Sequence, residues 1–233
     1  MKKDSQNTND ILECMSSLSN QLTREEREEF IANLTIQKYK KNETIYKEGD
    51  VPQMLLCLLT GKVKIYKDGV GGRTQIMQAI RPSGMFGYRA YFANQNYITA
   101  AAAFESSTIA MVPMRLVEKW CEENARLACF FMRSISDELG TTQERIVNLT
   151  QKHIRGRLAE TLLFLRDNFG TEDDGQTLSI TLSREDVANL SNMTTSNAIR
   201  TLSAFATENV IRLDGRRIII ENEEDLRHIS KMG

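Results

Sequence analysis

The stretch from Ser183 to Leu202 limits most strongly what this chain can form, because a polar turn joins two short helical patterns. Ser183 is the expected N-cap of the first helix, with Asp186 in the capping-box position. Ser191-Asn192-Met193 reads as the turn, and Thr194 caps the second helix. A polar Thr-Thr-Ser-Asn run ahead of an apolar stripe suits an exposed helix end. The pattern predicts a helix-turn-helix.

The second helix is expected to have two different sides. Ala198, Ile199 and Leu202 lie along one side and are predicted to pack on the first helix. Other sides carry polar groups near the helix start, where a recognition helix reaches base edges. An Arg can bind guanine O6 and N7, an Asn can address adenine, and hydroxyls bind bases or phosphates. The candidate DNA-contacting residues of this helix are Thr194, Thr195, Ser196, Asn197 and Arg200.

Residues 152–233 are expected to form one domain around this motif. The domain is expected to begin with another helix, whose apolar face is Leu158, Leu162, Leu165 and Phe169. TLSITLS, which follows it, is a strand candidate. VIRLDGRRIIIE predicts a β-hairpin, because two apolar runs flank Asp214-Gly215. Helices followed by a hairpin define a winged helix-turn-helix. The arginines expected to hold the DNA backbone are Arg184, Arg212, Arg216 and Arg217.

The charge of this domain is the main observation against DNA binding. Asp and Glu slightly outnumber Lys and Arg from residue 151 onward, and most of the acids fall in Glu172–Asp174 and Glu221–Asp225. We expect these two clusters to lie away from DNA, leaving one basic face and a strongly salt-dependent affinity. The alternative is a winged-helix protein-interaction module.

Short β-type runs recur over residues 36–112 and are separated by glycines. This spacing predicts a sandwich or small barrel of many short strands. The runs are ETIYKEG, MLLCLLTGKVKIYKDG, RTQIMQAI, YITAAAAF and STIAMV. Ahead of them, residues 1–35 read as a polar tail and a short helix in which Thr23 and Glu26 match a capping box.

Pro113 can start a helix at its first turn, and Asn124 is the N-cap candidate of a second, longer helix. Leu127, Phe130 and Phe131 form an apolar face that we expect to pack on the β domain. A second apolar line steps by three and four residues over more than three heptads, which favours a homodimer over a helix buried in one domain. We call this line the seam: Ala125, Ala128, Met132, Ile135, Leu139, Thr142, Ile146 and Leu149.

Composition bounds the remaining functions. The net charge of −1 gives no global basic signature. No apolar run approaches the length needed to cross a bilayer and the first residues are polar, so no membrane association and a cytoplasmic location are expected. The four cysteines form no C-x-x-C pair, and the two histidines lie far apart and are expected at the surface. We expect no bound metal and no cofactor.

These features together resemble the cyclic-AMP receptor protein / fumarate-nitrate regulator superfamily of bacterial transcription factors, over roughly residues 20–225. The motifs that carry the resemblance are EGD at Glu48–Asp50, TGKVKIY at Thr60–Tyr66, GMFG at Gly84–Gly87, Asn148-Leu149, GRLAETLL at Gly156–Leu163, and the helix-turn-helix with its wing. The resemblance implies a homodimer that binds a pseudo-palindromic operator and contacts RNA polymerase. It also implies that Ser183, Arg184 and Thr194 meet the DNA backbone, and that Thr195, Ser196 and Arg200 read bases.

The sensory half departs from the family pattern. Cyclic-AMP sensors carry Phe-Gly-Glu and, about ten residues later, Arg-Ser; this chain has Phe86-Gly87-Tyr88 and Ile98-Thr99. The ribose acceptor and the phosphate-binding cation are therefore missing, and burying a phosphodiester without its cation is unfavourable. We expect an unidentified effector, or none. The candidate pocket is Phe86, Gly87, Tyr88, Arg89, Ile98, Thr99 and Thr142. The alternative is a cyclic-nucleotide-responsive regulator with non-standard phosphate contacts.

Other inputs known for the family fit less well. An iron–sulfur sensor needs clustered N-terminal cysteines, and the tail offers Cys14 alone. A haem sensor or a cupin-type enzyme needs histidines in the β domain, which has none. We expect no catalytic residues. The predicted fold is α+β, with a tail, helix and β-roll over 1–123, a dimerisation helix over 124–151 and a winged helix-turn-helix over 152–233.

Overall fold

The computed structural model describes residues 8–232, so the start of the predicted polar tail lies outside the described residues. The chain forms two compact units, each of which is described by itself. The first includes the described residues up to Lys67 together with Met77–Leu139. The second includes Asp68–Ile76 and the described residues from Gly140 onward.

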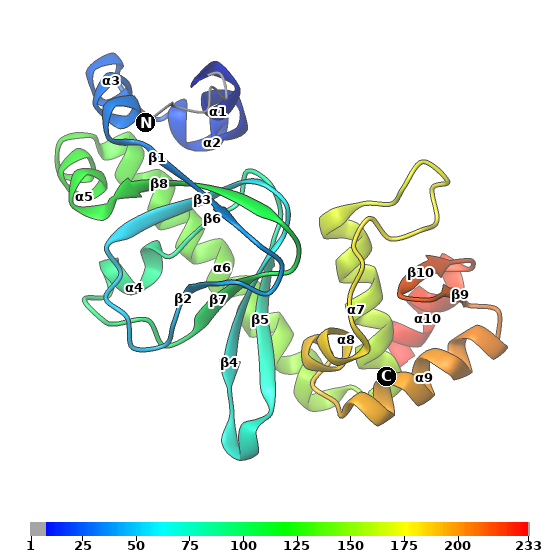
Figure 1. Cartoon of the computed structure of the whole chain (residues 1–233). Coiled ribbons are helices and arrows are strands. Elements are labelled where there is room, and N and C mark those ends of the chain that lie inside the picture. The colour runs from blue at the N-terminus through cyan, green and yellow to red at the C-terminus, as the bar shows by residue number, and fades with distance from the viewer. Residues whose placement is uncertain (1–7, 233) are drawn as a thin grey trace. The chain divides into compact units, whose positions relative to one another are not determined.

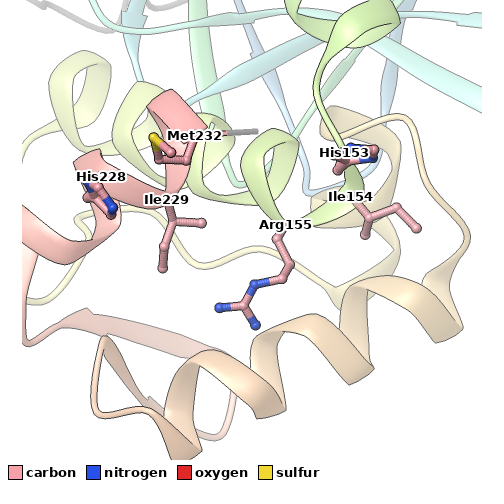
Figure 2. Close-up of a pocket in the computed structure, with 6 residues that line it drawn as sticks. All are labelled: His153, Ile154, Arg155, His228, Ile229 and Met232. Atoms are coloured by element: carbon pink, nitrogen blue, oxygen red, sulfur yellow. The ribbon is translucent and has the colours of Figure 1, made fainter.

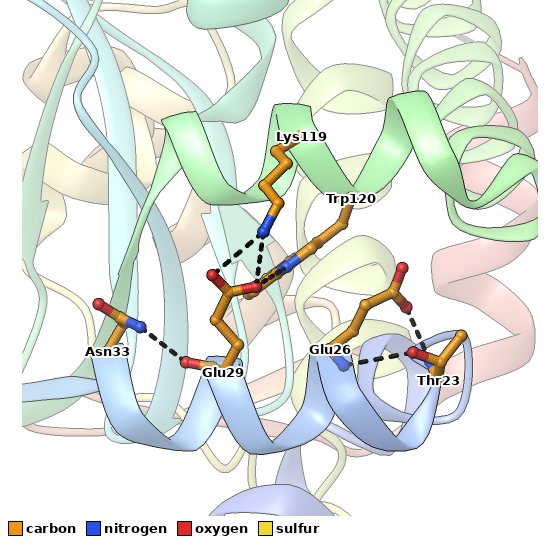
Figure 3. A network of polar contacts seen from close by, with 6 residues as sticks. All are labelled: Thr23, Glu26, Glu29, Asn33, Lys119 and Trp120. Carbon is orange, nitrogen blue, oxygen red and sulfur yellow. Dashed lines mark hydrogen bonds and ion pairs between the residues drawn. The ribbon is translucent and has the colours of Figure 1, made fainter.

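The first unit begins with three helices, α1 (Thr8–Cys14), α2 (Ser16–Ser19) and α3 (Arg24–Asn33). The predicted capping box starts α3: Thr23 Oγ1 accepts from the Glu26 N–H at 3.2 Å, and Glu26 Oε2 accepts from the Thr23 N–H at 2.7 Å. Figure 3 shows this cap beside a second polar contact, in which Glu29 faces Lys119 and Trp120. The cap satisfies two backbone donors that a helix start otherwise leaves free.

A β-roll of two four-stranded sheets follows (Figure 1). The strand orders are β1-β8-β3-β6 and β2-β7-β4-β5. The predicted runs became β2 (Thr44–Tyr46), β3 (Met54–Thr60), β4 (Val63–Asp68), β5 (Thr74–Ile80), β7 (Ala100–Ala103) and β8 (Ser107–Pro113). The sequence did not predict β1 (Thr35–Tyr39), β6 (Met85–Phe86), the 3-10 turn η1 (Val70–Gly72) or α4 (Tyr88–Phe92).

The turn between β3 and β4 shows why these strands are separated by glycines. Gly61 has a φ of +88°. A Cβ at this position would lie 2.4 Å from Ser107 Oγ and 2.5 Å from the Ser106 carbonyl oxygen. Only glycine fits a backbone that is both left-handed and this close to a neighbouring strand.

Two apolar clusters stabilise the first unit. One lies inside the roll and contains Leu58, Val63, Phe86, Ala101 and Ile109 among others. The other joins the N-terminal helices to one face of β3 and to α5 (Met114–Glu123) and α6 (Ala125–Gln151). Trp120 is at its centre, 1% exposed.

The long helix was predicted correctly at its start and on its inner face. Asn124 Oδ1 accepts from the Leu127 N–H at 3.1 Å, so Asn124 caps α6. Leu127 and Phe131 are buried in the helix cluster and Phe130 packs against it. The predicted β-domain face of this helix is therefore confirmed.

The second unit contains the expected winged helix-turn-helix and one unpredicted helix. Its elements are α7 (Ile154–Phe169), α8 (Arg184–Leu190), α9 (Thr195–Thr207), β9 (Ile211–Asp214), β10 (Arg217–Ile220) and α10 (Glu223–Met232). The predicted leucine face of α7 is buried, and α10, which was not predicted, packs on α7 through the fully buried Leu226. The strand prediction for TLSITLS was wrong: the segment makes only isolated bridges, from Thr177 to Ile219 of β10 and from Leu178 to Thr171.

Candidate nucleic-acid interface

The helix-turn-helix is fixed by the two predicted caps. Ser183 Oγ accepts from the Asp186 N–H at 3.0 Å, and Thr194 Oγ1 accepts from the Asn197 N–H at 3.3 Å. Between the helices, Asn192 adopts a left-handed φ of +51°, a conformation that asparagine tolerates better than most residues. The Met193 N–H then donates to the Ala188 carbonyl oxygen at 3.1 Å, which closes the turn.

The second helix of the motif, α9, has one buried and one exposed face. Ala198, Thr201, Leu202 and Phe205 are buried. Thr195, Ser196, Arg200 and Ser203 are exposed, and Asn197 is half-buried. Ile199 departs from the prediction, because its side chain is 47% exposed and it lies outside the stripe of buried residues, spaced three or four apart, that faces the core. The exposed face starts at the helix N-terminus, where backbone N–H groups favour phosphate.

The wing is a tight hairpin tied to the first helix of the motif. Arg217 pairs with Asp214 and Ile220 with Ile211, which leaves Gly215 and Arg216 as the two-residue loop. Gly215 has a φ of +57°. Arg184 Nη2 donates to the Gly215 carbonyl oxygen at 2.8 Å. Arg184 is half-buried and holds the wing loop through this hydrogen bond, so its guanidinium is only partly available to a phosphate. The same burial lowers the pKa of Arg184.

Two of the wing arginines already have carboxylate partners. Arg217 pairs with Glu172, and Arg212 Nε lies 2.8 Å from Glu221 Oε1. Each acidic cluster therefore places one carboxylate, Glu172 or Glu221, against a wing arginine. Both pairs are at least one-third exposed, and such surface pairs are weak, so a phosphate can replace the carboxylate. Arg200 and Arg216 are exposed.

The acidic loop before α8 has a structural role. Asp174 Oδ1 accepts from the backbone N–H groups of Gln176 at 3.0 Å and Thr177 at 2.8 Å. Its other oxygen accepts from the Thr177 hydroxyl at 2.5 Å. These hydrogen bonds, led by that from the Thr177 hydroxyl, lower the pKa of Asp174 to about 2. The carboxylate closes the loop that carries Glu172 to the wing.

The predicted effector residues of the β-roll do not all face one space. Phe86 is buried in the roll cluster, and Gly87 has a φ of +89°. Tyr88 belongs instead to the helix cluster, where its ring lies 5.4 Å from that of Phe131. Arg89 and Thr99 are half-buried, whereas the Ile98 side chain is 49% exposed. Thr142 lies in the second unit and is exposed.

Two tyrosines that the sequence did not single out fill the roll beside Gly87. The rings of Tyr46 and Tyr97 stack with centroids 3.8 Å apart, and a Cβ at Gly87 would lie 2.9 Å from Tyr97 Oη. Burial raises the pKa of Tyr46 to about 12, against a hydrogen bond with Thr99 and the charge of Arg89. Glu138 of α6 adds to that rise and accepts a hydrogen bond from Gln78. The charges of Arg89 and of the Glu138 carboxylate therefore both act on Tyr46.

The seam of α6 is largely exposed. Met132 is 63%, Leu139 57% and Ile146 56% exposed, while Leu149 is half-buried. Ile135 departs from the prediction in part, because it packs against the helix cluster of its own chain. Three large apolar side chains in line on one helix leave a surface that favours a partner.

A separate pocket of about 550 Å³ lies between the start of α7 and α10 (Figure 2). Its lining is His153, Ile154, Arg155, His228, Ile229 and Met232. Both histidines are exposed, as expected. Arg155 makes two hydrogen bonds with Glu208, at 2.9 and 2.6 Å, and lies 5.0 Å from the Phe205 ring centroid. Arg155 therefore braces α7 against the end of α9.

Residues 8–232 contain no helix with the length and apolar character of a membrane span. Over the same residues, no three His, Cys, Asp or Glu side chains gather in a way that could hold a metal ion.

A β-roll, a long helix and a winged helix-turn-helix with a polar recognition helix define a two-domain DNA-binding regulator. Comparisons agree: residues 36–124 match the family model of the cyclic nucleotide-binding domain, and residues 156–229 that of the Crp-like helix-turn-helix domain. The chain belongs to the cyclic-AMP receptor protein / fumarate-nitrate regulator family of transcriptional regulators. Members of this family bind DNA operators and act as dimers.

Individual relatives are similar over most of their length. The CRP-like cAMP-activated global transcriptional regulator of Mycobacterium tuberculosis is 27% identical, over 81% of this chain and 84% of that protein. The fumarate and nitrate reduction regulatory protein of Yersinia pestis is 26% identical, over 82% and 76%. The structure of FixK2 from Bradyrhizobium japonicum shares the fold, with a TM-score of 0.77 over 84% of this chain and 96% of that one, at 24% identity.

Proposed function

We propose that the protein is a cytoplasmic homodimer that binds a pseudo-palindromic operator in double-stranded DNA through the exposed face of α9. The observation that carries this proposal is the polar, capped N-terminus of α9, with Thr195, Ser196 and Arg200 all exposed. Two copies joined along the seam would present two such helices about one DNA turn apart. We also expect the bound dimer to contact RNA polymerase, as the resemblance to this family implies.

Each contact has a role that follows from its chemistry. Arg200 would bind a guanine edge through two hydrogen bonds, and Thr195, Ser196 and Asn197 would address neighbouring bases. Ser183 and Thr194 stand at helix starts and would place their hydroxyls and backbone N–H groups near phosphates. Arg216 at the wing loop is the exposed cation for the backbone, and Arg184 supports that loop.

For the input, we propose that the roll does not bind cyclic AMP. A cyclic phosphodiester would meet no arginine at the Ile98-Thr99 position, and Glu138 would repel its charge. The stacked Tyr46 and Tyr97 rings occupy space beside Gly87. An effector suited to this roll would be small and would carry groups for both Arg89 and a carboxylate.

The proposed function is tested by selecting fragments of genomic DNA with the purified full-length protein. We expect enrichment of one two-fold-related motif whose half-sites are centred about one helical turn apart. Enrichment of no motif, with retention of DNA only at low salt, would overturn sequence-specific regulation and favour the protein-interaction alternative.

Arg200→Ala is expected to weaken binding to the selected operator by about 1–3 kcal/mol for each half-site and to relax the preference at one base position. The reason is the loss of a two-hydrogen-bond contact to a base. Fluorescence anisotropy with operator variants measures both effects. Arg115→Ala is the control, since Arg115 is an exposed arginine on α5. An unchanged base preference for Arg200→Ala would exclude it as a base reader.

Millimolar cyclic AMP is expected to leave both the melting temperature and the operator affinity unchanged, because the roll lacks the phosphate-binding cation. A thermal-shift assay and a DNA-binding titration measure the two quantities. A rise of several degrees, or a clear change in operator affinity, would contradict the proposed roll chemistry and support the cyclic-nucleotide alternative.

A further inference from the structure

Ile199 is unusual in α9, because it is a large apolar residue placed on the exposed face of that helix. The other large apolar side chains of this helix, Leu202 and Phe205, are fully buried. Ile199 is 47% exposed. Leaving an isoleucine in water forgoes the stabilisation that its burial would give, so a buried environment in the bound state would explain its presence here.

The neighbours of Ile199 define which environment that is. It follows Thr195 by four residues and Ser196 by three, so all three share one side of the helix. Ser203 continues that side by four residues, and Arg200 flanks it. These neighbours are exposed and polar. An apolar side chain framed by hydroxyls and one arginine, in the second turn of a recognition helix, fits the major groove of DNA.

Within the major groove, one base carries an apolar group. The C5-methyl of thymine is the only methyl that the four standard bases present there, and the remaining edge atoms are hydrogen-bond donors or acceptors. If Ile199 packed against a donor or acceptor of a base edge, that group would lose its hydrogen bond to water and gain none in return. A thymine methyl avoids that loss and buries apolar surface on both sides.

We propose that Ile199 reads the C5-methyl of a thymine in each half-site, beside the base that Arg200 contacts. This inference rests on the proposed function and adds an apolar specificity determinant to the polar ones. Helical spacing predicts Ile199 on the side that packs on the first helix of the motif, whereas its exposure in the folded domain points to this role.

The experiment uses the full-length protein and the selected operator. Each thymine of the half-site is replaced in turn by deoxyuridine, which removes the methyl and keeps every hydrogen-bonding group. For the wild type, we expect one position per half-site where the change weakens binding about fourfold, and about fifteenfold when both half-sites are changed, as burial of one methyl-sized group implies.

Two variants of Ile199 test whether this side chain is the one that contacts the thymine methyl. Ile199→Ala should bind the thymine operator about as weakly as the wild type binds the deoxyuridine operator, and should no longer distinguish the two. Ile199→Val keeps a branched apolar side chain and should still distinguish them. Because Ile199 is 47% exposed, we expect both variants to have the melting temperature of the wild type. Measuring the melting temperatures checks that the fold of each variant is intact.

The outcomes separate this inference from the proposed function. Failure to select any operator would overturn the proposed function itself. Selection of an operator on which the wild type and Ile199→Ala show the same deoxyuridine sensitivity at every position would overturn only the reading role of Ile199. If Ile199→Ala bound the operator as tightly as the wild type, the reading role of Ile199 would likewise be overturned. The exposed side chain would then not contact the DNA.

Discussion

A Leu139→Lys variant is expected to be monomeric and to bind the selected operator at least about 100-fold more weakly than the wild type. Leu139 is 57% exposed in the isolated chain and stands between Met132 and Ile146 on the seam. A homodimer would bury it against its own counterpart, where two ammonium groups would face each other in a dry interface. Loss of the dimer removes the gain in affinity from binding two half-sites at once.

Light scattering during size-exclusion chromatography measures the oligomeric state, and anisotropy with the full operator measures the affinity. Glu144→Lys is the matched control, because Glu144 is exposed on the same helix five residues further on and lies off the seam. It should remain dimeric. A Leu139→Lys protein that is still a dimer at micromolar concentration would show that the copies associate through another surface.

The parts of the fold that the sequence predicted are those with local signals. The helix-turn-helix was placed from Ser183 and Thr194, whose hydroxyls cap helices within three residues of themselves. The wing was placed from Asp214-Gly215, since a two-residue hairpin loop needs a residue with positive φ. The start and inner face of α6 followed from Asn124 and from helical spacing. In each case the signal and the structure that it specifies lie within a few residues.

The parts that were missed depend on partners far away in the chain. Strand β1 carries four exposed residues and becomes a strand because β8, more than sixty residues later, pairs with it. Glu172 meets Arg217 and Glu221 meets Arg212 only once the loop and wing are folded. Counting charges along the sequence does not reveal these two ion pairs.

The roll interior shows the same limit for a candidate site. Tyr46, Tyr97 and Glu138 come from three distant segments, and nothing in their local sequence marks them as neighbours of Gly87 or Arg89. A motif comparison finds which family residues are absent at Phe86–Arg89 and Ile98-Thr99. It does not show which side chains lie beside Gly87 and Arg89 instead. Only the fold shows that two stacked tyrosine rings lie beside Gly87 and that the Glu138 carboxylate acts on one of them.

Trp120→Ala is expected to destabilise the first unit by about 3–5 kcal/mol, a large part of the 5–15 kcal/mol by which a typical domain is stable. Trp120 is 1% exposed, and the centroid of its ring lies 6.3 Å from that of Phe30. It links α5 to α3 (Figure 3). The truncation leaves a cavity where the N-terminal helices meet the roll. Urea unfolding followed by circular dichroism measures the loss, since the chain has a single tryptophan and the variant has no tryptophan fluorescence.

Trp120→Phe separates packing from the polar contact. It keeps most of the volume but removes the Nε1–H that donates to Glu29 Oε2 at 2.7 Å. That hydrogen bond, aided by Lys119, holds the pKa of Glu29 below its usual value, so the wild type loses this contribution as the pH falls through the folded-state pKa. In Trp120→Phe the pKa of Glu29, followed by NMR titration, should rise. Glu122→Ala, on the exposed side of α5, is the control and should unfold like the wild type. If Trp120→Ala did so too, the N-terminal helices would not depend on this contact, and the folding of the first unit would rest on the roll alone.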